Sequence, residues 1–372
     1  KSLDGEVLLR SDVSHRFSPT DLFEAGTQFR FLRNNNVFYM PADYDAFGQP
    51  RQEIDIDKVS TGFKFGANVQ YTKTLFQRLS LIGGLRYDYF DYLNKPGAVS
   101  PRAAIRYNLQ DNLMLNFACG LYQQAPPFVW LVGDERNRNL SYIKAVHTVA
   151  GLEYYPSDDI KITLEIFNKE YSDYPASVVN PQVSYASIGS DYGVIGLEEL
   201  VSGSAGHSRG IEFFLQKKLT SDLYGLVNYS LSETKGHALD GIERSSSFDY
   251  RHVFTAILGY KFTNSLELSV KWRYTSGRPY TPIDIDASRK NNQLVLDYNR
   301  INAERFPAYH RLDIRLDKRY DFDGWSLVTY IDIQNAYNRA NIETYIWNEK
   351  TQDVDVVYQW RILPVGGVKV EF

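Results

Sequence analysis

One segment of the sequence matches a motif that holds the nucleophilic serine of many hydrolases, so hydrolysis is the first chemistry to consider. Residues 206–210, Gly-His-Ser-Arg-Gly, have the G-x-S-x-G spacing that presents a serine on a sharp turn between a strand and a helix. Here a long polar stretch precedes the segment, and the alternating sequence IEFFLQKK follows it and predicts a strand. The entry to a strand explains the five residues better than a catalytic serine does. We therefore expect no enzyme activity and no catalytic residue.

Metal binding would need histidine, cysteine or carboxylate side chains at close spacing. The six histidines, at positions 15, 147, 207, 237, 252 and 310, are scattered along the chain. Asp43, Asp45, Gly48 and Glu53, and the acidic segment at 284–294, loosely resemble calcium loops, but neither group has the EF-hand spacing. We expect these carboxylates to be solvated, and we expect no metal site and no bound cofactor.

Aromatic residues near the ends of predicted strands are the candidates for ligand contact. The chain has 28 Tyr and 21 Phe, and aromatic residues make up 15% of it. Trp130 and Trp347 lie in or beside long predicted loops, and Tyr122 and Gln124 lead into one of these loops. Aromatic rings there can stack on a ligand, and they can equally pack a loop or anchor a chain at a membrane interface. Packing is the role we favour for the two tryptophans.

Apolar and polar residues alternate with a period of two along most of the chain. This pattern predicts β-strands, and these strands must position the side chains named above. Clean examples are residues 160–167, 266–274 and 311–317, each part of a segment long enough to cross a bilayer as a tilted strand of roughly 9 to 11 residues. One face of such a strand suits lipid and the other suits water. Cys119 lies in a similar segment, where we expect a small membrane-facing or packed residue rather than a reactive thiol.

The connections between these segments alternate between short and long. The short turns are predicted at 18–20, 72–76, 109–112, 156–159, 219–222, 262–264 and 320–324. The long links are predicted at about 34–57, 124–142, 174–206, 236–248, 276–306 and 339–354, with one short member of this set near 94–97. A soluble β-sandwich also alternates along its strands, but short turns at one end and long loops at the other are typical of outer-membrane barrels.

The sequence therefore predicts an all-β fold, a transmembrane antiparallel β-barrel that occupies residues 1–372 as one domain. We count about fifteen strands, from a first strand at 6–17 that descends toward the short turns to a last strand at 357–372. Because single-chain bacterial barrels have an even number of strands, we expect a fragment that lacks at least one strand and its N-terminal leader. No apolar run reaches the 18 residues that a membrane-spanning helix requires. A net charge of −4 gives no general attraction to nucleic acid.

From about Val99 onward the sequence resembles the C-terminal barrel of TonB-dependent receptors, in the order in which that family arranges its strands. Four stretches carry the resemblance: SPRAAIRYNLQDNLMLNFACGLYQQAPP, AGHSRGIEFFLQKKLTSDLYGLVNYSLSETKG with its RG-x-E strand, FPAYHRLDIRLDKRY with WSLVTYIDIQNAYNRANI and its N-x-Y-N-R ending, and the closing PVGGVKVEF. The terminal Phe372, after Val368 and Val370, also resembles the signal by which the barrel-assembly machinery recognises outer-membrane proteins.

The resemblance implies a barrel of twenty-two strands around an N-terminal plug, of which this chain would supply strands eight to twenty-two. It also implies location in the bacterial outer membrane, contact with outer-membrane lipid, and energy-coupled import of a small nutrient through TonB. The nutrient would be a siderophore, haem, cobalamin, an oligosaccharide or a peptide. Lumen-facing charges are expected to pair with neighbouring strands or with the plug. These charges are Arg311, Asp313, Arg315 and Asp317.

Three other functions stay open at this point. A passive, porin-like channel would work without a plug or TonB. A barrel enzyme would need a catalytic group clustered at one level of the wall. A structural barrel subunit of an envelope complex would be found with stable partner proteins.

Overall fold

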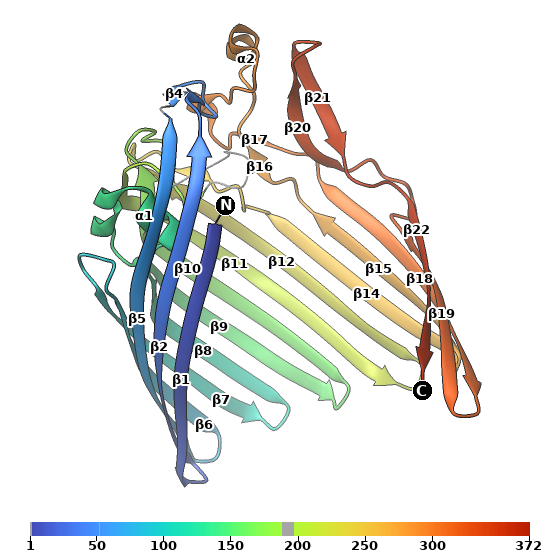
Figure 1. The fold of residues 1–372 in the computed structure, drawn as a ribbon. Helices are drawn as coiled ribbons and strands as arrows, with labels where there is room; N and C mark the ends of the chain where they lie inside the picture. The colour runs from blue at the N-terminus through green and yellow to red at the C-terminus, as the bar shows by residue number, and fades with distance from the viewer. Residues whose placement is uncertain (1, 52, 188–196) are drawn as a thin grey trace.

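The computed structural model describes residues 2–51, 53–187 and 197–372. Fifteen strands of this described part follow one another in a single antiparallel sheet, as the sequence predicts (Figure 1). They are β1 (Ser2–Ser18), β2 (Asp21–Met40), β5 (Ile54–Leu75), β6 (Leu79–Phe90), β7 (Gly97–Gln110), β8 (Leu113–Gln124), β9 (Ile143–Ser157), β10 (Ile160–Ser177), β11 (Leu200–Thr220), β12 (Leu223–His237), β14 (His252–Thr263), β15 (Leu266–Thr275), β18 (Tyr309–Phe322), β19 (Trp325–Gln334) and β22 (Leu363–Glu371). The short β13 (Arg244–Ser245) lies off this path and pairs with the loop end of β12.

The turns and loops alternate between the two ends of the sheet, which confirms the predicted alternation of short and long connections. Two- or three-residue turns connect the strands at one end, and the long loops lie at the other end (Figure 1). The loops contain short elements of their own. These are β3 (Asp43–Tyr44), β4 (Pro50–Arg51), α1 (Phe128–Gly133), η1 (Glu135–Asn139), β16 (Pro279–Tyr280), α2 (Ile285–Asn291), η3 (Tyr298–Arg300), β17 (Glu304–Arg305), β20 (Ile342–Asn348) and β21 (Asp353–Tyr358).

Several strands are longer than the sequence predicts. The pairing of β2 with β5 continues to Met40 and Ile54, inside the predicted 34–57 link. Strand β11 begins at Leu200, which pairs with Ser177 of β10 beyond a bulge at Asp173. Polar side chains do not end these strands, because the neighbouring strand still satisfies the backbone N–H and C=O groups. Residues 188–196 of the predicted 174–206 loop lie outside the described residues.

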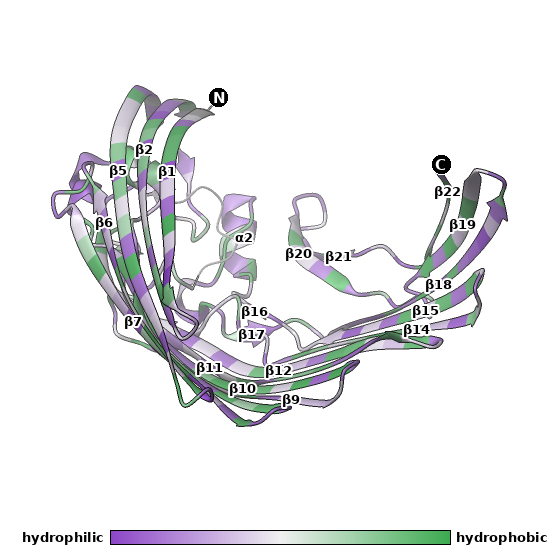
Figure 2. Cartoon of the chain, turned by 90° about the horizontal axis from the view of Figure 1, so that it is seen from below, coloured by the Kyte–Doolittle hydropathy of each residue, from purple (hydrophilic) through white to green (hydrophobic). Residues whose placement is uncertain are grey.

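The sheet curves into an open trough rather than a closed barrel. Within the described residues, β1 pairs with β2 and β22 pairs with β19, so these two strands form the two edges of the sheet. Figure 2 shows the trough from the turn end, with β1 and β22 on opposite sides of the opening and the loop elements α2, β20 and β21 within its width. None of the helices in the described part of the chain is both long and apolar enough to span a membrane.

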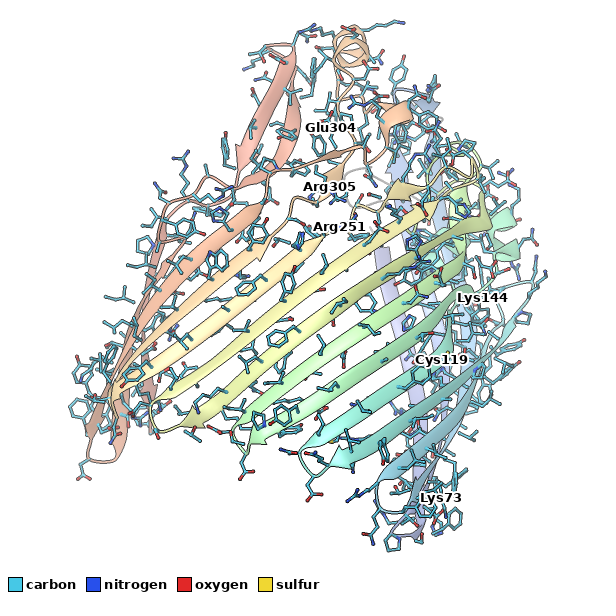
Figure 3. All side chains as sticks on the ribbon, turned by 180° about the vertical axis from the view of Figure 1, so that it is seen from behind. Lys73, Cys119, Lys144, Arg251, Glu304 and Arg305 are labelled. Carbon is cyan, nitrogen blue, oxygen red and sulfur yellow. The ribbon has the colours of Figure 1, made fainter. Side chains whose placement is uncertain are left out.

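The convex face of the trough carries a continuous apolar band. The register places apolar side chains of neighbouring strands opposite one another: the exposed Phe29 lies beside the half-buried Phe65, and the exposed Leu115 beside the half-buried Leu152. Cys119 shares this face with Leu115 and is exposed there (Figure 3), as predicted for a small membrane-facing residue. A continuous ladder of backbone hydrogen bonds under an apolar surface suits the lipid-facing wall of a β-barrel.

Fully buried apolar side chains gather among the loops rather than against the sheet. Phe90 at the end of β6, Leu131 in α1 and Leu140 after η1 are at most 1% exposed, and Val183 and Leu296 from other loops join the same cluster. Four chain segments far apart in the sequence therefore share one small hydrophobic core at the loop end. This core fixes the loops above the concave face, where the candidate site lies.

Candidate functional site

A cationic hollow lies on the concave face, just below the loop core. It encloses about 330 Å³ between β2, β5, β6 and the loop after β8. Arg30, Lys64 and Arg86 line it together with a single carboxylate, Asp88. Lys64 stands directly opposite Arg30 in the pairing of β2 with β5, so the ladder itself places two cations side by side. We call these three cations with Gln124 the lumen pocket.

Each cation of the lumen pocket is held by a different contact. Arg86 makes a two-pronged ion pair with Asp88, at 2.6 and 2.7 Å. The Lys64 ammonium lies 4.4 Å from the centroid of the Phe90 ring. Arg30 lies 3.4 Å from Glu6 of β1. Three cations against one lining carboxylate favour an anionic ligand, because like-charged walls of a hollow concentrate the opposite charge.

Gly66 makes room for this arrangement. A Cβ at position 66 would lie 2.9 Å from the Gln28 amide nitrogen and 3.0 Å from a guanidinium nitrogen of Arg86. A larger residue would therefore displace the two polar side chains that cross the pocket floor. The glycine acts here through the space it leaves rather than through an unusual backbone angle.

The upper rim of the pocket is built by the loop that follows β8. Gln124 ends β8 and lines the pocket, and Pro126, Pro127 and Tyr142 continue the lining. The Tyr142 hydroxyl donates a hydrogen bond to the carbonyl oxygen of Pro96 at 3.0 Å, and burial raises its pKa, so it stays a donor near neutral pH. The rim is thus tied to the β6–β7 connection.

Asn137 fastens the same loop from above. Its buried side-chain amide donates to the carbonyl oxygens of Trp130 and Glu198, at 2.8 and 2.9 Å, and its oxygen accepts from the N–H of Leu200. Residues 125–142 are thereby linked to the start of β11. Nearby, Asp134 caps η1 and forms an ion pair with Arg136, whose hydrogen bond lowers the pKa of the Asp134 carboxyl.

The predicted ligand-contact residues occupy different environments. Tyr122 faces the lumen below the pocket, where the Arg102 guanidinium lies 4.6 Å from its ring centroid and His147 lies 4.5 Å away. Gln124 lines the pocket. Trp130 packs edge-to-face on Tyr185 at 5.1 Å within the loop core, which is a packing role. The structure therefore brings Tyr122 and Gln124 to the lumen and separates Trp130 from it.

The two remaining predicted residues lie far from the pocket along the chain. Trp347 belongs to β20, in the hairpin that β20 and β21 form above the last strands (Figure 1). Phe372 follows β22 and its side chain is fully exposed at the turn end of the sheet. Neither residue contributes to the lining of the lumen pocket.

The serine motif lies inside a strand. Residues 206–210 all belong to β11, so the predicted strand entry is wrong by six residues: the strand already begins at Leu200. Ser208 hydrogen-bonds the Thr234 hydroxyl at 3.0 Å across the ladder, while its neighbour His207 points to the opposite face. A strand rather than a sharp turn holds this serine.

The acidic segments serve as loop caps. Asp45 accepts hydrogen bonds from the N–H groups of Phe47 and Gln49, and Asn180 donates to its second oxygen. Asp284 caps α2 by accepting from the N–H of Ala287 at 2.9 Å. Among the described residues, no group of three or more His, Cys, Asp or Glu side chains is arranged to hold a metal ion.

The lumen-facing charges of β18 are paired mainly along their own strand, whereas the prediction was pairing with neighbouring strands or a plug. Arg315 binds Asp317 at 2.7 Å and Arg311 binds Asp313 at 2.7 Å. A neighbouring strand contributes one longer contact, from Arg273 of β15 to Asp313 at 3.7 Å. These i,i+2 pairs form because alternate residues of a strand share one face.

Sequence reasoning missed the three cations of the lumen pocket. Arg30, Lys64 and Arg86 come from three strands and form no local motif, so nothing in their spacing marks them as a group. The signal exists only in the strand register: aligning the apolar faces of β2 and β5 puts Arg30 opposite Lys64.

Comparison with known protein families shows the family to which this chain belongs. The family model described as "TonB dependent receptor-like, beta-barrel" matches residues 2–336. The match spans most of the chain, so the chain belongs to this family, as its resemblance predicted. Receptors of this family are transporters of the bacterial outer membrane rather than enzymes. No curated protein sequence matches the chain.

Solved structures share the fold. The ferric-catecholate import receptor Fiu from E. coli K12 superposes with a TM-score of 0.64 at 12% identity, covering 99% of this chain and 54% of its own. The FrpB iron transporter from Neisseria meningitidis gives 0.68 at 14%, covering 100% and 56%. The ferric enterobactin receptor PfeA from Pseudomonas aeruginosa, in complex with enterobactin, gives 0.63 at 14%, covering 91% and 50%. This chain spans about half the length of each.

Proposed function

We propose that this chain forms part of the wall and loop surface of an outer-membrane receptor that imports a small anionic nutrient, with energy supplied through TonB. The family match supports the transport class, and the similar solved structures include receptors for ferric catecholates and ferric enterobactin. On that basis the favoured nutrient is a ferric siderophore with net negative charge. A plug domain and TonB are the expected protein partners, and outer-membrane lipid surrounds the apolar band.

The observation that carries the choice of ligand charge is the lumen pocket. Its three cations lie on the concave face below the loops, on the side from which an external ligand would enter. Tyr122 and Arg102 continue the polar lining toward the turn end, and Gln124 adds an amide at the rim. A neutral oligosaccharide or a cationic peptide would leave the charge of this pocket uncompensated.

Equilibrium binding to the full-length receptor tests this proposal. Ferric complexes of similar size but different charge are titrated: a triply anionic tris-catecholate complex and a neutral hydroxamate complex. We expect the anionic complex to bind at least ten-fold more tightly, with an affinity that falls as the salt concentration rises. Equal affinities would contradict the preference for an anionic ligand. If neither complex binds and neutral sugars pass freely through the purified protein, the porin-like channel is favoured.

A further inference from the structure

A second group of cations lies on the concave face of the sheet, away from the lumen pocket. The pairing of β15 with β18 places Arg273 directly opposite Arg311, and it places Lys271 opposite Asp313 two residues nearer the turn end. Alternate residues of a strand share one face, so all four side chains face the lumen. Figure 2 shows β15 and β18 on the flank of the trough opposite β2 and β5, which carry part of the lumen pocket. We call Lys271, Arg273, Arg311 and Asp313 the wall site.

The carboxylate of the wall site is bound by Arg311 and by the backbone. Asp313 accepts a hydrogen bond from Arg311 at 2.7 Å and another from the N–H of Asn335 at 3.0 Å. A guanidinium nitrogen of Arg273 lies 3.7 Å from the same carboxylate, which is beyond hydrogen-bond distance. The side chain of Asp313 is only 11% exposed, so these contacts fix it in place. Asp313 therefore neutralises Arg311 better than it neutralises Arg273.

The two cations of β15 keep most of their charge. In the part of the chain that the structure describes, no carboxylate forms an ion pair with Lys271, and the buried Nε of Arg273 has no hydrogen-bond partner. The residues opposite them on β14 are Thr255 and Ile257, which carry no charge. Like charges directly opposite one another in a ladder destabilise the pair of strands. The register of β15 with β18 therefore leaves a repulsion between Arg273 and Arg311.

The other acids of this face lie nearer the turn end. Asp317 binds Arg315 at 2.7 Å, and Asp332 of β19 stands opposite Arg315 in the ladder. Glu267 of β15 stands opposite Asp317. The excess of positive charge is thus confined to the loop end of β15 and β18, where three cations face one carboxylate.

The geometry of the two arginines suits one small oxyanion. The Cβ atoms of residues directly opposite in an antiparallel pair are about 4.5–5.5 Å apart, and each guanidinium presents its N–H donors in a planar fork. A phosphate-sized anion between the two forks can accept hydrogen bonds from both arginines at once. The side chains of Arg273 and Arg311 are 37% and 24% exposed, so both are accessible from the lumen.

We propose that Arg273 and Arg311, together with Lys271, bind one small oxyanion from solution, of the chemical class of inorganic phosphate. The anion neutralises the charge that Asp313 leaves uncompensated and removes the repulsion between the two arginines. Its binding therefore stabilises the β15–β18 part of the wall. The inference does not rest on the nutrient, on TonB or on the lumen pocket.

Equilibrium dialysis of the full-length receptor in detergent against radiolabelled inorganic phosphate tests the inference. Chloride salts hold the ionic strength constant. We expect a saturable phosphate whose affinity Arg273→Gln lowers by about ten-fold or more, because the variant loses charge-assisted hydrogen bonds. Arg106→Gln is the matched control, because Arg106 is another arginine of the concave face but stands opposite the neutral Ser80 and Asn116. It should leave the phosphate affinity within about two-fold of the original value.

Urea unfolding supplies a second readout on the same proteins. Phosphate should raise the unfolding midpoint of the unaltered receptor more than that of Arg273→Gln, because a ligand that binds the folded state stabilises it. The comparison between the two proteins removes the general effect of phosphate as a salt. In chloride alone, Arg273→Gln should be at least as stable as the unaltered receptor, because the substitution removes a repulsion.

Three results would overturn the inference. The first is equal phosphate binding by the unaltered receptor and Arg273→Gln. The second is a phosphate that Lys64→Gln removes and Arg273→Gln does not, which would place it in the lumen pocket. The third is no saturable phosphate at all; if Arg273→Gln is then also less stable in chloride, a carboxylate from another part of the full-length receptor occupies the wall site instead.

Discussion

Among the described residues, no carboxylate forms an ion pair with Lys64 of the lumen pocket, and its ammonium lies over the Phe90 ring. The other two cations have carboxylate partners, because Arg86 binds Asp88 and Arg30 lies near Glu6. Substituting Lys64→Gln should therefore weaken binding of an anionic ligand by about ten-fold, because one charge-assisted contact contributes roughly 1.5 kcal/mol. Isothermal titration of the full-length receptor with the anionic ferric complex measures the change.

Lys169→Gln is the matched control for this prediction. Lys169 is another lumen-side lysine whose ammonium lies over an aromatic ring, 4.9 Å from the centroid of Phe167, but it does not line the pocket. Its substitution should leave the affinity within about two-fold of the original value, a difference under 0.5 kcal/mol. An equal loss in both variants would mean that general lumen charge, and not the pocket, attracts the ligand.

Asp134 gives the loop above the pocket an acid-sensitive contact. The hydrogen bond from Arg136 holds the pKa of this carboxyl below its ordinary value, so its stabilising effect is complete above the unfolded pKa of about 3.9 and is lost as the pH falls through the lower, folded pKa. Amides at 135–140 should lose protection from hydrogen exchange in this acid range, after correction for the intrinsic exchange rate.

Asp134→Asn separates this contact from general acid unfolding. The variant keeps a side-chain oxygen for the N–H of Arg136 but loses the charge, so its loop protection should be lower at neutral pH and should change less between neutral and acid pH. Identical pH profiles for the two proteins would contradict the role of Asp134.

Individual residues of the site were the hardest part to predict from the sequence. The sequence left ligand contact and packing open for Trp130, with packing favoured, and Trp130 packs on Tyr185 within the loop core. Arg30 and Lys64 were not predicted as site residues, because each is one polar residue in an ordinary alternating strand, and 34 positions separate them. Their proximity is a product of strand register, which a single segment does not contain.

At the scale of the strands, a glycine opposite a lumen-facing ring leaves the space that the ring occupies. A Cβ at Gly259 of β14 would lie 2.1 Å from the ring of Tyr224 on the adjacent β12, and the Tyr224 hydroxyl donates to Glu267 of β15. Gly259→Ala should therefore lower the free energy of unfolding by about 1–3 kcal/mol, because the ring must leave its position and its hydrogen bond.

Gly83→Ala provides the comparison. Nothing lies within 4 Å of a Cβ at Gly83, in β6, so alanine there should be neutral or should stabilise the strand by up to about 1 kcal/mol. Urea unfolding of the full-length protein in detergent, followed by tryptophan fluorescence, measures both variants. A destabilisation of the same size at both positions would point to a general intolerance of side chains and not to the Tyr224 contact.

The strands themselves were predictable because the physical signal is repeated in every one of them. A lipid-facing side and a water-facing side impose a period of two, and the short turns between Ser157 and Ile160 or between Thr220 and Leu223 punctuate it. The loop elements were not predictable in this way. The strands β20 and β21 and the helix α2 are each only six or seven residues long. Contacts between loops, such as the stacking of Tyr345 on Phe306, hold such elements in place.

At the scale of the whole molecule, the chain is a curved wall whose two faces have opposite chemistry. The convex face carries an apolar band, and the concave face carries the lumen pocket under a fixed set of loops. The family match and the solved structures place this wall among TonB-dependent receptors, and the chain spans about half the length of the structures it resembles. Import and coupling to TonB are therefore proposed for the full-length receptor and not for this part of it alone.

Uptake of a radiolabelled anionic ferric siderophore by cells that produce the full-length receptor tests the central claim most directly. Accumulation is measured in energised cells, in cells treated with a protonophore, and in cells that lack TonB. We predict saturable uptake in the energised cells and loss of nearly all of it in the other two. Uptake that continues at the same rate without energy or TonB would contradict the account and would favour a passive channel.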